Sequence, residues 1–418
     1  MVASVLTNSS AMVALQTLRA TNSSLNEVNN QISTGKKVAE ARDNAAVFAI
    51  TKVMESDVAG FKAVEETLSL GNATATVAND AAGQLNGLLN EIKGKIISAN
   101  EDNVDRDALQ AELVSLRNQV AGVVGAAQFN GLNLLSNTEQ TAGTGTVNVL
   151  SSLDRDSSGA VTTSSIDVVK QDLGTGAAAI QGTITDVGAN KTVNTTAIAD
   201  GTTADVADIN AAGLVVGTAF RLDLTKFGGT GTVDYVIRDG DTATSASQAI
   251  ADKANFALAA GGFDLTTGSF SVDGGGTLQF TNNTGAALTA LAATDFQSDA
   301  AGTGATAHTV GGGLEILSSL DISTDTGAEA ALVGIESLIN TTINAQASFG
   351  TAQKRIELQS DFMSKLIDSF KVGIGALVDA DLEEASARLQ ALQVQQQLGI
   401  QSLSIANQAP QNILALFR

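Results

Sequence analysis

Few side chains of this chain are of the kinds that perform catalysis or bind metal ions. The sequence holds one histidine, His308, and no cysteine, so it lacks thiol nucleophiles, disulfides and the commonest structural zinc ligand. His308 lies in a stretch of Gly, Ala and Thr with no neighbouring acid. A catalytic histidine needs a nucleophile or a carboxylate within hydrogen-bond reach. We therefore expect His308 to be a solvated loop residue.

Two groups of carboxylates could form sites, but each has a simpler explanation. Asp239-Gly240-Asp241 suggests a calcium loop, yet the other EF-hand ligands are missing, so a turn is predicted. The second group is Asp379, Asp381, Glu383 and Glu384. Because Asp381 and Glu384 have the spacing of a capping box, a capped and solvated helix start is predicted rather than an acid/base cluster.

Two glycine clusters complete the candidates for chemistry. Gly228-Gly229-Thr230-Gly231 and Gly274-Gly275-Gly276 lack the Lys-Ser/Thr pair that follows a phosphate-binding loop, so both are predicted to be turns. With no catalytic arrangement in the sequence, we expect neither an enzyme nor a cofactor.

Composition narrows the class of protein. The 418 residues suffice for two or three domains. The net charge of −21 argues against nucleic acid or an anionic membrane as partner, since both require a basic surface. Hydrophobic residues make up 44% of the chain but aromatics only 4%, and there is one proline, which suits long helices packed through small side chains.

Neither a membrane span nor a cleavable signal is visible. No apolar run reaches the length that a bilayer requires. The first basic residue is Arg19, and residues 1–8 lack the basic and apolar regions of a secretory signal. Export of the protein would therefore need a route that does not use such a signal.

The first 135 residues are predicted to be helical. Leu15, Leu18, Leu25 and Ile32 follow the 3–4 spacing of an a/d seam, with the polar Asn22 on or near it. The helix that carries this seam should end near a glycine at position 35. Two further helices are expected, from about 43 to 100 and from about 105 to 125, before an Asn-Gly turn.

The last 94 residues are also predicted to be helical. One helix should begin near residue 326, with a soft joint at Gly373 and Gly375. The next carries a seam through Leu389, Leu392 and Leu403, and Pro410 is predicted to end it. Beyond the proline lies an apolar tail that includes Ile413, Leu414 and Phe417.

The middle of the chain has a different pattern. A β-hairpin is predicted near 146–169, followed by a β-rich region from 174 to 320 with strands that alternate in polarity and one short helix near 246–259. The whole is therefore predicted to be an α+β multidomain protein, whose discontinuous, all-α coiled-coil and bundle core is built from both termini. Helices at both ends usually form an intramolecular bundle, but the polar seam and the apolar extreme ends favour burial against other molecules.

Both ends of the chain carry a series of short motifs. They include Asn8-Ser9-Ser10-Ala11, Ile32-Ser33-Thr34-Gly35, Asp43-Asn44-Ala45-Ala46, Phe129-Asn130-Gly131, Ala406-Asn407-Gln408-Ala409-Pro410 and Leu416-Phe417-Arg418. By these motifs and their order, the two ends resemble bacterial flagellin, over essentially all of 1–135 and 325–418. The form Asp43-Asn44-Ala45-Ala46-Val47 is similar to α-proteobacterial flagellins, including rhizobial ones.

The resemblance implies a division into three domains. Residues 1–40 and 376–418 would form a terminal coiled coil that lines the channel of an extracellular filament. Residues 41–173 and 321–375 would form the surrounding tube, and 174–320 a variable outer domain. The termini would be disordered in the monomer and fold on assembly, after unfolded export through the flagellar type III apparatus. The implied partners are the chain itself, other flagellins, an export chaperone, and hook-junction and cap proteins.

The resemblance also bears on immune recognition. In many flagellins an animal innate immune receptor reads an Arg and a Leu on the second helix and a Glu on the third. The corresponding positions here are Glu91, Lys95 and Glu112, so two of the three differ and one reverses its charge. Weak activation of that receptor is expected.

Three alternatives to a filament subunit remain. The nearest is a flagellin-like hook–filament junction protein, although its C-terminal sequence usually departs further from the Ala406–Pro410 pattern. An acidic coiled-coil adhesin or export-linked binding module would leave the matched ends unexplained, and an enzyme inserted in the middle is least favoured.

Overall fold

The computed structural model describes residues 8–416 except 157, 159, 182, 183, 185, 187 and 300–307, with side chains as far as Gln408. The chain divides into two compact units, residues 1–65 with 361–418 and residues 66–360. Two long helices, α2 (Ala45–Ala99) and α6 (Asp325–Val378), contribute to both. Among the described residues, no helix combines the length and the apolar character needed to cross a membrane.

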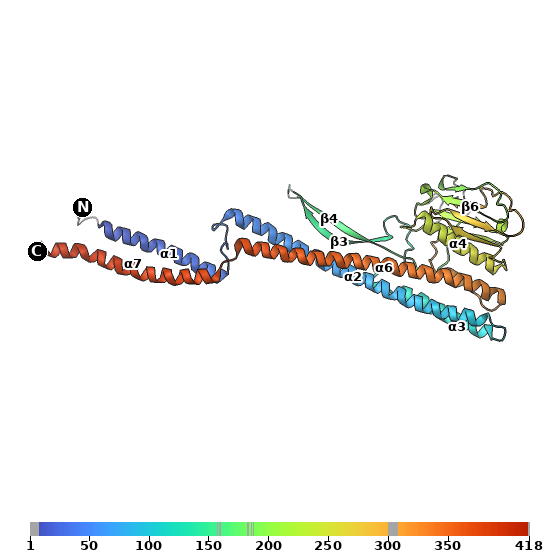
Figure 1. Ribbon diagram of the computed structural model, residues 1–418, viewed down its shortest axis with the longest axis horizontal. Helices are drawn as coiled ribbons and strands as arrows, with labels where there is room; N and C mark the ends of the chain where they lie inside the picture. Colours follow the sequence, from blue (N-terminus) through green and yellow to red (C-terminus); the bar gives the residue numbers. More distant parts are fainter. Residues whose placement is uncertain are drawn as a thin grey trace. The chain divides into compact units, whose positions relative to one another are not determined.

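The first unit is built around an antiparallel pair of terminal helices, α1 (Ser9–Thr34) and α7 (Leu382–Leu416), which lie side by side in Figure 1. At one end of the pair, the carbonyl of Gly35 accepts a hydrogen bond of 3.0 Å from the backbone N–H of Ala380. Gly35 has a φ of 70°, a left-handed conformation that glycine adopts without steric cost. The predicted helix end at this glycine is confirmed.

Two predicted helix interruptions are wrong. The helix α6 continues through Gly373 and Gly375 to Val378, and the backbone of α7 continues through Pro410 to Leu416. A glycine costs a helix only about 1 kcal/mol, and a Cβ at position 373 would come 3.3 Å from Met54 Cε, so the small residue permits close packing. The proline removes one N–H donor without breaking the rest of the hydrogen-bond ladder.

The second unit contains a helical bundle of α2, α3 (Arg106–Ala126) and α6. Its core combines leucine and isoleucine with many alanines. Buried members include Leu68, Ala75, Ala78, Leu85, Leu89, Ile92, Leu113, Val120, Ile335, Leu338, Phe349 and Ile356. Polar contacts cross this core, since Asn79 donates to Gln353 at 2.9 Å and Gln353 donates to Thr76 at 2.8 Å. Helices α2 and α3 begin and end, and α6 begins, within two residues of the predicted positions.

Two β-hairpins follow α3 in the sequence. The first joins β1 (Gln128–Phe129) to β2 (Leu132–Asn133) through Asn130 and Gly131, whose φ angles are 49° and 80°. Consecutive positive φ values define the tight hairpin turn that Asn-Gly favours. The second pairs β3 (Thr146–Arg155) with β4 (Val161–Val169), as predicted, with a bulge between Leu150 and Ser152 (Figure 1).

Two antiparallel sheets form the β-rich region. The four-stranded sheet has the order β5 (Lys191–Val193), β6 (Thr202–Ile209), β10 (Leu278–Asn282), β9 (Gly268–Val272). The three-stranded sheet has the order β11 (Phe296–Asp299), β7 (Ala219–Asp223), β8 (Thr232–Val236). Helix α4 (Ala243–Ala260) packs on strands of both sheets, and the short α5 (Ile316–Ser319) leads towards α6.

Six of the chain's 15 aromatic residues are buried in the core of this region. The rings of Phe227, Phe270 and Phe280 meet with centroids 4.8 to 4.9 Å apart. Phe220 stacks on Phe296 at 5.6 Å, and the chain's one tyrosine, Tyr235, is buried nearby. Aromatic pairs of this kind stabilise a core beyond their area alone. The predicted α+β class is confirmed.

Candidate assembly surface

The seam between α1 and α7 is narrow. Its buried centre consists of Val28, Ala385 and Leu392, and three half-buried residues pack against it. These three, Leu25, Ile32 and Leu389, were predicted for the seam, as was Leu392. Val28 and Ala385 belong to the same 3–4 pattern in the sequence but are shorter than leucine. The apolar core of the pair is therefore only six residues.

The other predicted seam residues are less buried. A Cβ at Gly399 would meet Leu18 at 3.3 Å, so the absence of a side chain there lets the helices approach. Leu15 is largely exposed and Leu403 is half-buried. The side chains of Ile413 and Leu414, and residues Phe417 and Arg418, lie outside the part that the structure describes.

Several apolar side chains on both helices are exposed. Met12 and Ile405 are each 68% exposed, and Val13, Leu398 and Ile400 are more than half exposed. A shallow groove of about 1010 Å³ runs between the helices, with Val13, Leu398 and Ile405 in its walls. The seam prediction did not include these residues, although they occupy apolar positions beside it in the sequence. This exposed apolar patch on the two helices is unusual for a protein that acts as a monomer.

Polar contacts also join the two helices. Gln396 donates to the side-chain oxygen of Asn22 at 2.7 Å, which places one predicted polar seam residue opposite a partner. Nearer the helix ends, Asn8 donates to the backbone carbonyl of Ala406 at 2.7 Å. Hydrogen bonds are directional, so they select one alignment of the helices where apolar contacts tolerate several.

The remaining family-motif positions occupy helix starts and turns. Asn44 caps α2 by accepting from the N–H of Val47 at 3.1 Å, and Ala45 and Ala46 begin that helix. The carboxylate of Asp43 accepts from two backbone N–H groups of the preceding loop, each at 3.0 Å. Asn407 is exposed. These positions shape the connection between α1 and α2.

His308 differs from its prediction as a solvated loop residue. The residue is buried, with 8% of its surface exposed. Its Nδ1 accepts from the N–H of Gln181 at 3.2 Å, and its Nε2 lies 3.6 Å from the carboxylate of Asp299. The adjacent residue Thr309 forms a β-bridge with Ala179, which holds the histidine inside. Among the described residues, no group of three His, Cys, Asp or Glu side chains could hold a metal ion.

The predicted turns are confirmed, and their carboxylates bind protein donors. Asp239 accepts from the N–H groups of Gly143 and Gly145, at 2.8 and 2.7 Å. Gly240, which follows it, has a φ of 92°. Both glycine clusters also contain turn residues with positive φ, Gly228 and Gly276 among them.

The C-terminal carboxylates mark a helix start, as predicted. Asp381 accepts from the backbone N–H groups of Glu383 and Glu384, at 2.9 and 3.2 Å. All three side chains are exposed, as is that of Asp379. Acidic groups at this position also interact favourably with the helix dipole.

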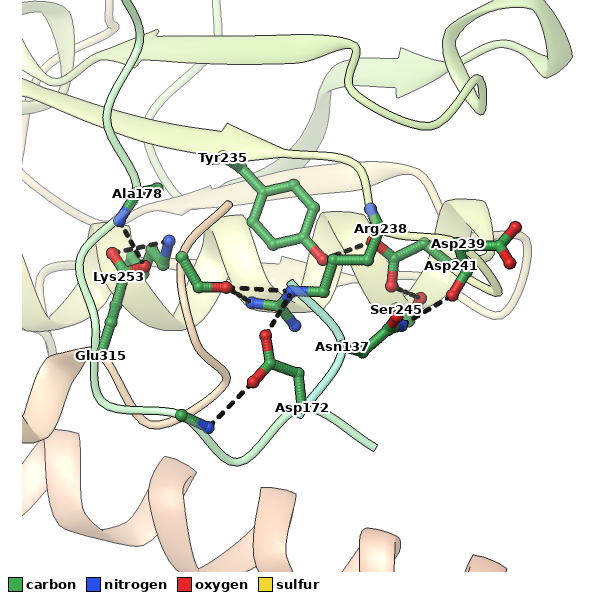
Figure 2. A network of polar contacts seen from close by, with 12 residues as sticks. Asn137, Asp172, Ala178, Tyr235, Arg238, Asp239, Asp241, Ser245, Lys253 and Glu315 are labelled. Atoms are coloured by element: carbon green, nitrogen blue, oxygen red, sulfur yellow. Dashed lines mark hydrogen bonds and ion pairs between the residues drawn. The ribbon is translucent and has the colours of Figure 1, made fainter. Parts of the chain in front are cut away.

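A buried polar network in the second unit was not predicted. Figure 2 shows Arg238, just after β8, donating twice to the carbonyl of Gly311, while its Nε lies 3.3 Å from Asp172. Lys253 on α4 pairs with Glu315 at 2.7 Å. These groups line a cavity of about 360 Å³. Their partners come from distant parts of the sequence, so spacing along the chain gave no signal.

Burial changes the titration of this network. Burial raises the pKa of Asp172, although the positive charge of Arg238 partly opposes the shift. Burial lowers the pKa of Lys253, against the attraction of Glu315. The hydroxyl of Tyr235 and the N–H of Arg238 both donate to Asp241, at 2.7 and 2.9 Å. The network therefore ties β8 and α4 to the loop before α5 (Figure 2).

The three positions linked to immune recognition lie on α2 and α3. Lys95 and Glu112 form an ion pair at 2.5 Å, and this contact raises the pKa of Lys95. Glu91 is exposed.

Comparison with known proteins agrees with these features. Residues 5–140 match the model of the bacterial flagellin N-terminal helical region, and residues 332–417 that of the C-terminal helical region. Flagellin A of Rhizobium meliloti strain 1021 is 38% identical over 99% of this chain and 100% of its own length. Another R. meliloti Flagellin A is 32% identical over the same shares. The solved FliC of Burkholderia pseudomallei covers 68% of this chain and 99% of its own, at 19% identity and a TM-score of 0.29.

The rhizobial relatives confirm the predicted α-proteobacterial branch. Because both terminal regions match and relatives align along nearly the whole length, the chain belongs to the bacterial flagellins, the structural proteins of the extracellular flagellar filament.

Proposed function

We propose that this chain polymerises through its terminal helices, and that neighbouring subunits cover the exposed apolar patch of α1 and α7. The observation that carries this proposal is the contrast between a six-residue seam and the exposed apolar side chains of the same two helices, Met12, Val13, Leu398, Ile400 and Ile405 among them. Burying such side chains contributes about 1.5–3 kcal/mol each. A pair that leaves them in water gains little stability alone and much from neighbours.

The geometry of the pair suits an open polymer. Helix α1 has 26 residues, which corresponds to about 39 Å of axial length. A rod of this length can contact neighbours above and below its own level. A contact between two different surfaces that does not close into a ring, repeated in every subunit, generates a helical filament.

The same helices should be incompletely folded before assembly. Their seam offers too little apolar burial to offset the conformational entropy of ordering two helices, so folding and assembly are coupled. We propose that the chain is exported unfolded through the flagellar type III apparatus. In the assembled filament, we propose that residues 1–40 and 376–418 line the channel. Residues 41–173 and 321–375 would form the surrounding tube, and residues 174–320 the outer domain. The proposed partners are further copies, other flagellins, an export chaperone, and hook-junction and cap proteins.

One substitution tests the apolar patch directly. We expect Ile405→Ser to raise the critical concentration for seeded polymerisation about tenfold or more, because apolar burial is lost at every contact. The matched control is Val215→Ser, at a side chain 52% exposed in the β-rich region. Equal effects of the two substitutions would refute the proposed surface.

A preparation of cell-surface fibres tests the role itself. Fibres sheared from cells and pelleted should contain this chain as their dominant protein. Its absence would defeat the proposal, and its presence in a few copies per fibre would favour the hook–filament junction alternative.

Mild proteolysis tests coupled folding. Protease should trim soluble monomer at both ends to a stable core of roughly 40–370 that no longer polymerises, because unfolded termini are cleaved first. A trimmed core that polymerised normally would contradict the proposal.

Immune recognition is a separate proposal. We propose weak activation of the animal flagellin receptor, because Lys95 is held by Glu112 and Glu91 carries the wrong charge. In a reporter assay, the double substitution Glu91→Arg with Lys95→Leu should increase potency. Potency of the unmodified chain equal to that of an enterobacterial flagellin would contradict this view.

A further inference from the structure

The side chain of Asn8 makes two different contacts at the start of α1. Its oxygen accepts from the backbone N–H of Ala11 at 3.0 Å, which caps the helix. Its amide nitrogen donates to the carbonyl of Ala406 on α7 at 2.7 Å. Both polar atoms of one side chain are therefore used, one within its own helix and one across the pair.

The carbonyl of Ala406, to which Asn8 donates, differs from the other carbonyls of α7 in its possible hydrogen-bond donors. In an α-helix each carbonyl accepts from the N–H four residues later. For Ala406 that residue is Pro410, which lies within the helical backbone of α7 and has no N–H to donate. Ala406 therefore lacks its helical donor, and the amide of Asn8 occupies that role.

We propose that Asn8 and Pro410 act together as a register lock: the proline frees one carbonyl of α7, and the asparagine of α1 fixes the alignment of the pair by binding it. This proposal rests on the proposed assembly function, in which the pair must present one surface to its neighbours. Asn8 is thus a positioning residue for assembly, acting through α7.

The rest of the pair explains why a lock is needed there. The buried residues Val28 and Ala385 lie towards the end closed by Gly35 and Ala380. Towards the other end the facing side chains are small or exposed, as at Gly399 and Leu15. A slip of one residue moves a helix by about 1.5 Å, enough to break a 2.7 Å hydrogen bond but not to penalise sparse apolar contacts.

A double-mutant cycle tests the lock in the full-length chain. The substitution Asn8→Ser keeps a capping oxygen, because Ser and Asn cap equally well, but removes the amide donor. We expect it to raise the critical concentration for seeded polymerisation about three- to tenfold, the loss of one hydrogen bond. In a Pro410→Ala background the helix supplies its own donor, so the same substitution should cost less than twofold.

A second asparagine provides the control. Asn22 also bonds across the pair, to Gln396, but far from Pro410. The effect of Asn22→Ser should therefore be the same in both backgrounds. The proposed lock is refuted if Asn8→Ser raises the critical concentration equally in both backgrounds. It is also refuted if Asn8→Ser raises the critical concentration less than twofold when Pro410 is present.

Failure of the lock and failure of the assembly function can be told apart. If the unmodified chain does not polymerise, the assembly function fails, and the cycle is then read from hydrogen-exchange protection of α1 amides in the soluble full-length chain. Loss of protection in Asn8→Ser that Pro410→Ala restores supports the lock, and unchanged protection refutes it. If Asn8→Ser abolishes assembly outright, the double variant Asn8→Ser with Pro410→Ala is compared with it. Recovery of assembly in the double variant supports the lock, and no recovery refutes it.

Discussion

The terminal helix pair and the β-rich region of this flagellin bury their apolar residues to very different extents. Between α1 and α7, three apolar residues are buried. The β-rich core contains 21, among them five phenylalanines and the one tyrosine. The β-rich region also has buried ion pairs such as Lys253–Glu315, whereas the pair is held by exposed hydrogen bonds such as Asn22–Gln396. One region buries its apolar residues within the molecule, whereas the other leaves apolar side chains exposed, which we propose further copies cover.

The largest expected effect comes from a substitution in the core of the β-rich region, which tests whether this region and the terminal pair are stabilised independently. We expect Phe220→Ala to lower the free energy of unfolding of that region by about 3–5 kcal/mol, because it leaves a cavity against Phe296. Urea unfolding can be followed by tyrosine fluorescence, since Tyr235 is the only tyrosine and the chain has no tryptophan. Polymerisation under native conditions should be unchanged, and a loss of polymerisation would show that the regions are not independent.

The second prediction concerns the buried network. We expect Asp172→Asn to cost about 2–3 kcal/mol in the same measurement, because Arg238 keeps its bonds to Gly311 but loses its charge partner. Replacing both residues by apolar ones, Asp172→Leu with Arg238→Met, should recover part of this loss. A double variant worse than the sum of both single variants would contradict the expected pairing.

The third prediction addresses the terminal pair. We expect Val28→Ala to weaken the pair by about 1.5 kcal/mol per subunit, because two buried methyl groups are lost. The effect should appear as a lower temperature of filament depolymerisation, while urea unfolding of the β-rich region stays the same. Val13→Ala, on the exposed side of α1, is the informative companion, because it should affect assembly without affecting the seam.

The smallest expected effect is a dependence on pH. Burial raises the folded-state pKa of Asp172 above its ordinary value of 3.8. Between 3.8 and that raised pKa the folded state holds more protons than the unfolded state, so stability falls as pH rises through this window and is constant above it. The stability advantage of the unmodified chain over Asp172→Asn in urea unfolding should therefore fall as pH rises across the window. Exposed carboxylates with lowered pKa, such as Asp273, shift both proteins equally and cancel.

The sequence was sufficient for the long helices and for the hairpin near 146–169. Their period-3.6 and period-2 patterns extend over many residues, and Gly35 and Asn130-Gly131 are strong local signals. The sequence did not predict strand β6, because half of the eight residues of Thr202–Ile209 are Ala or Asp, which are depleted in strands. Its neighbours β5 and β10 decide its conformation through pairing.

The functional residues were also predictable only in part. Leu25, Ile32, Leu389 and Leu392 were predictable, because a seam is a local repeat along each helix. His308 accepts a hydrogen bond from Gln181, 127 positions away, and Arg238 pairs with Asp172, 66 positions away, so no periodicity along the chain signals these contacts. A helix end is predicted at Pro410 because proline usually breaks a helix, whereas in the structure α7 continues and Asn8 donates to the carbonyl of Ala406.

The antiparallel pairing of α1 and α7 has an evolutionary consequence. The pair is fixed at Gly35 with Ala380 and again at Asn8 with Ala406, so the two stretches between these points must have nearly equal length. An insertion or deletion in one terminal helix can persist only when a matching change occurs near the opposite end of the gene. Loops of the β-rich region carry no such constraint, so length variation among related genes should concentrate in the middle, and rare terminal changes should occur in pairs.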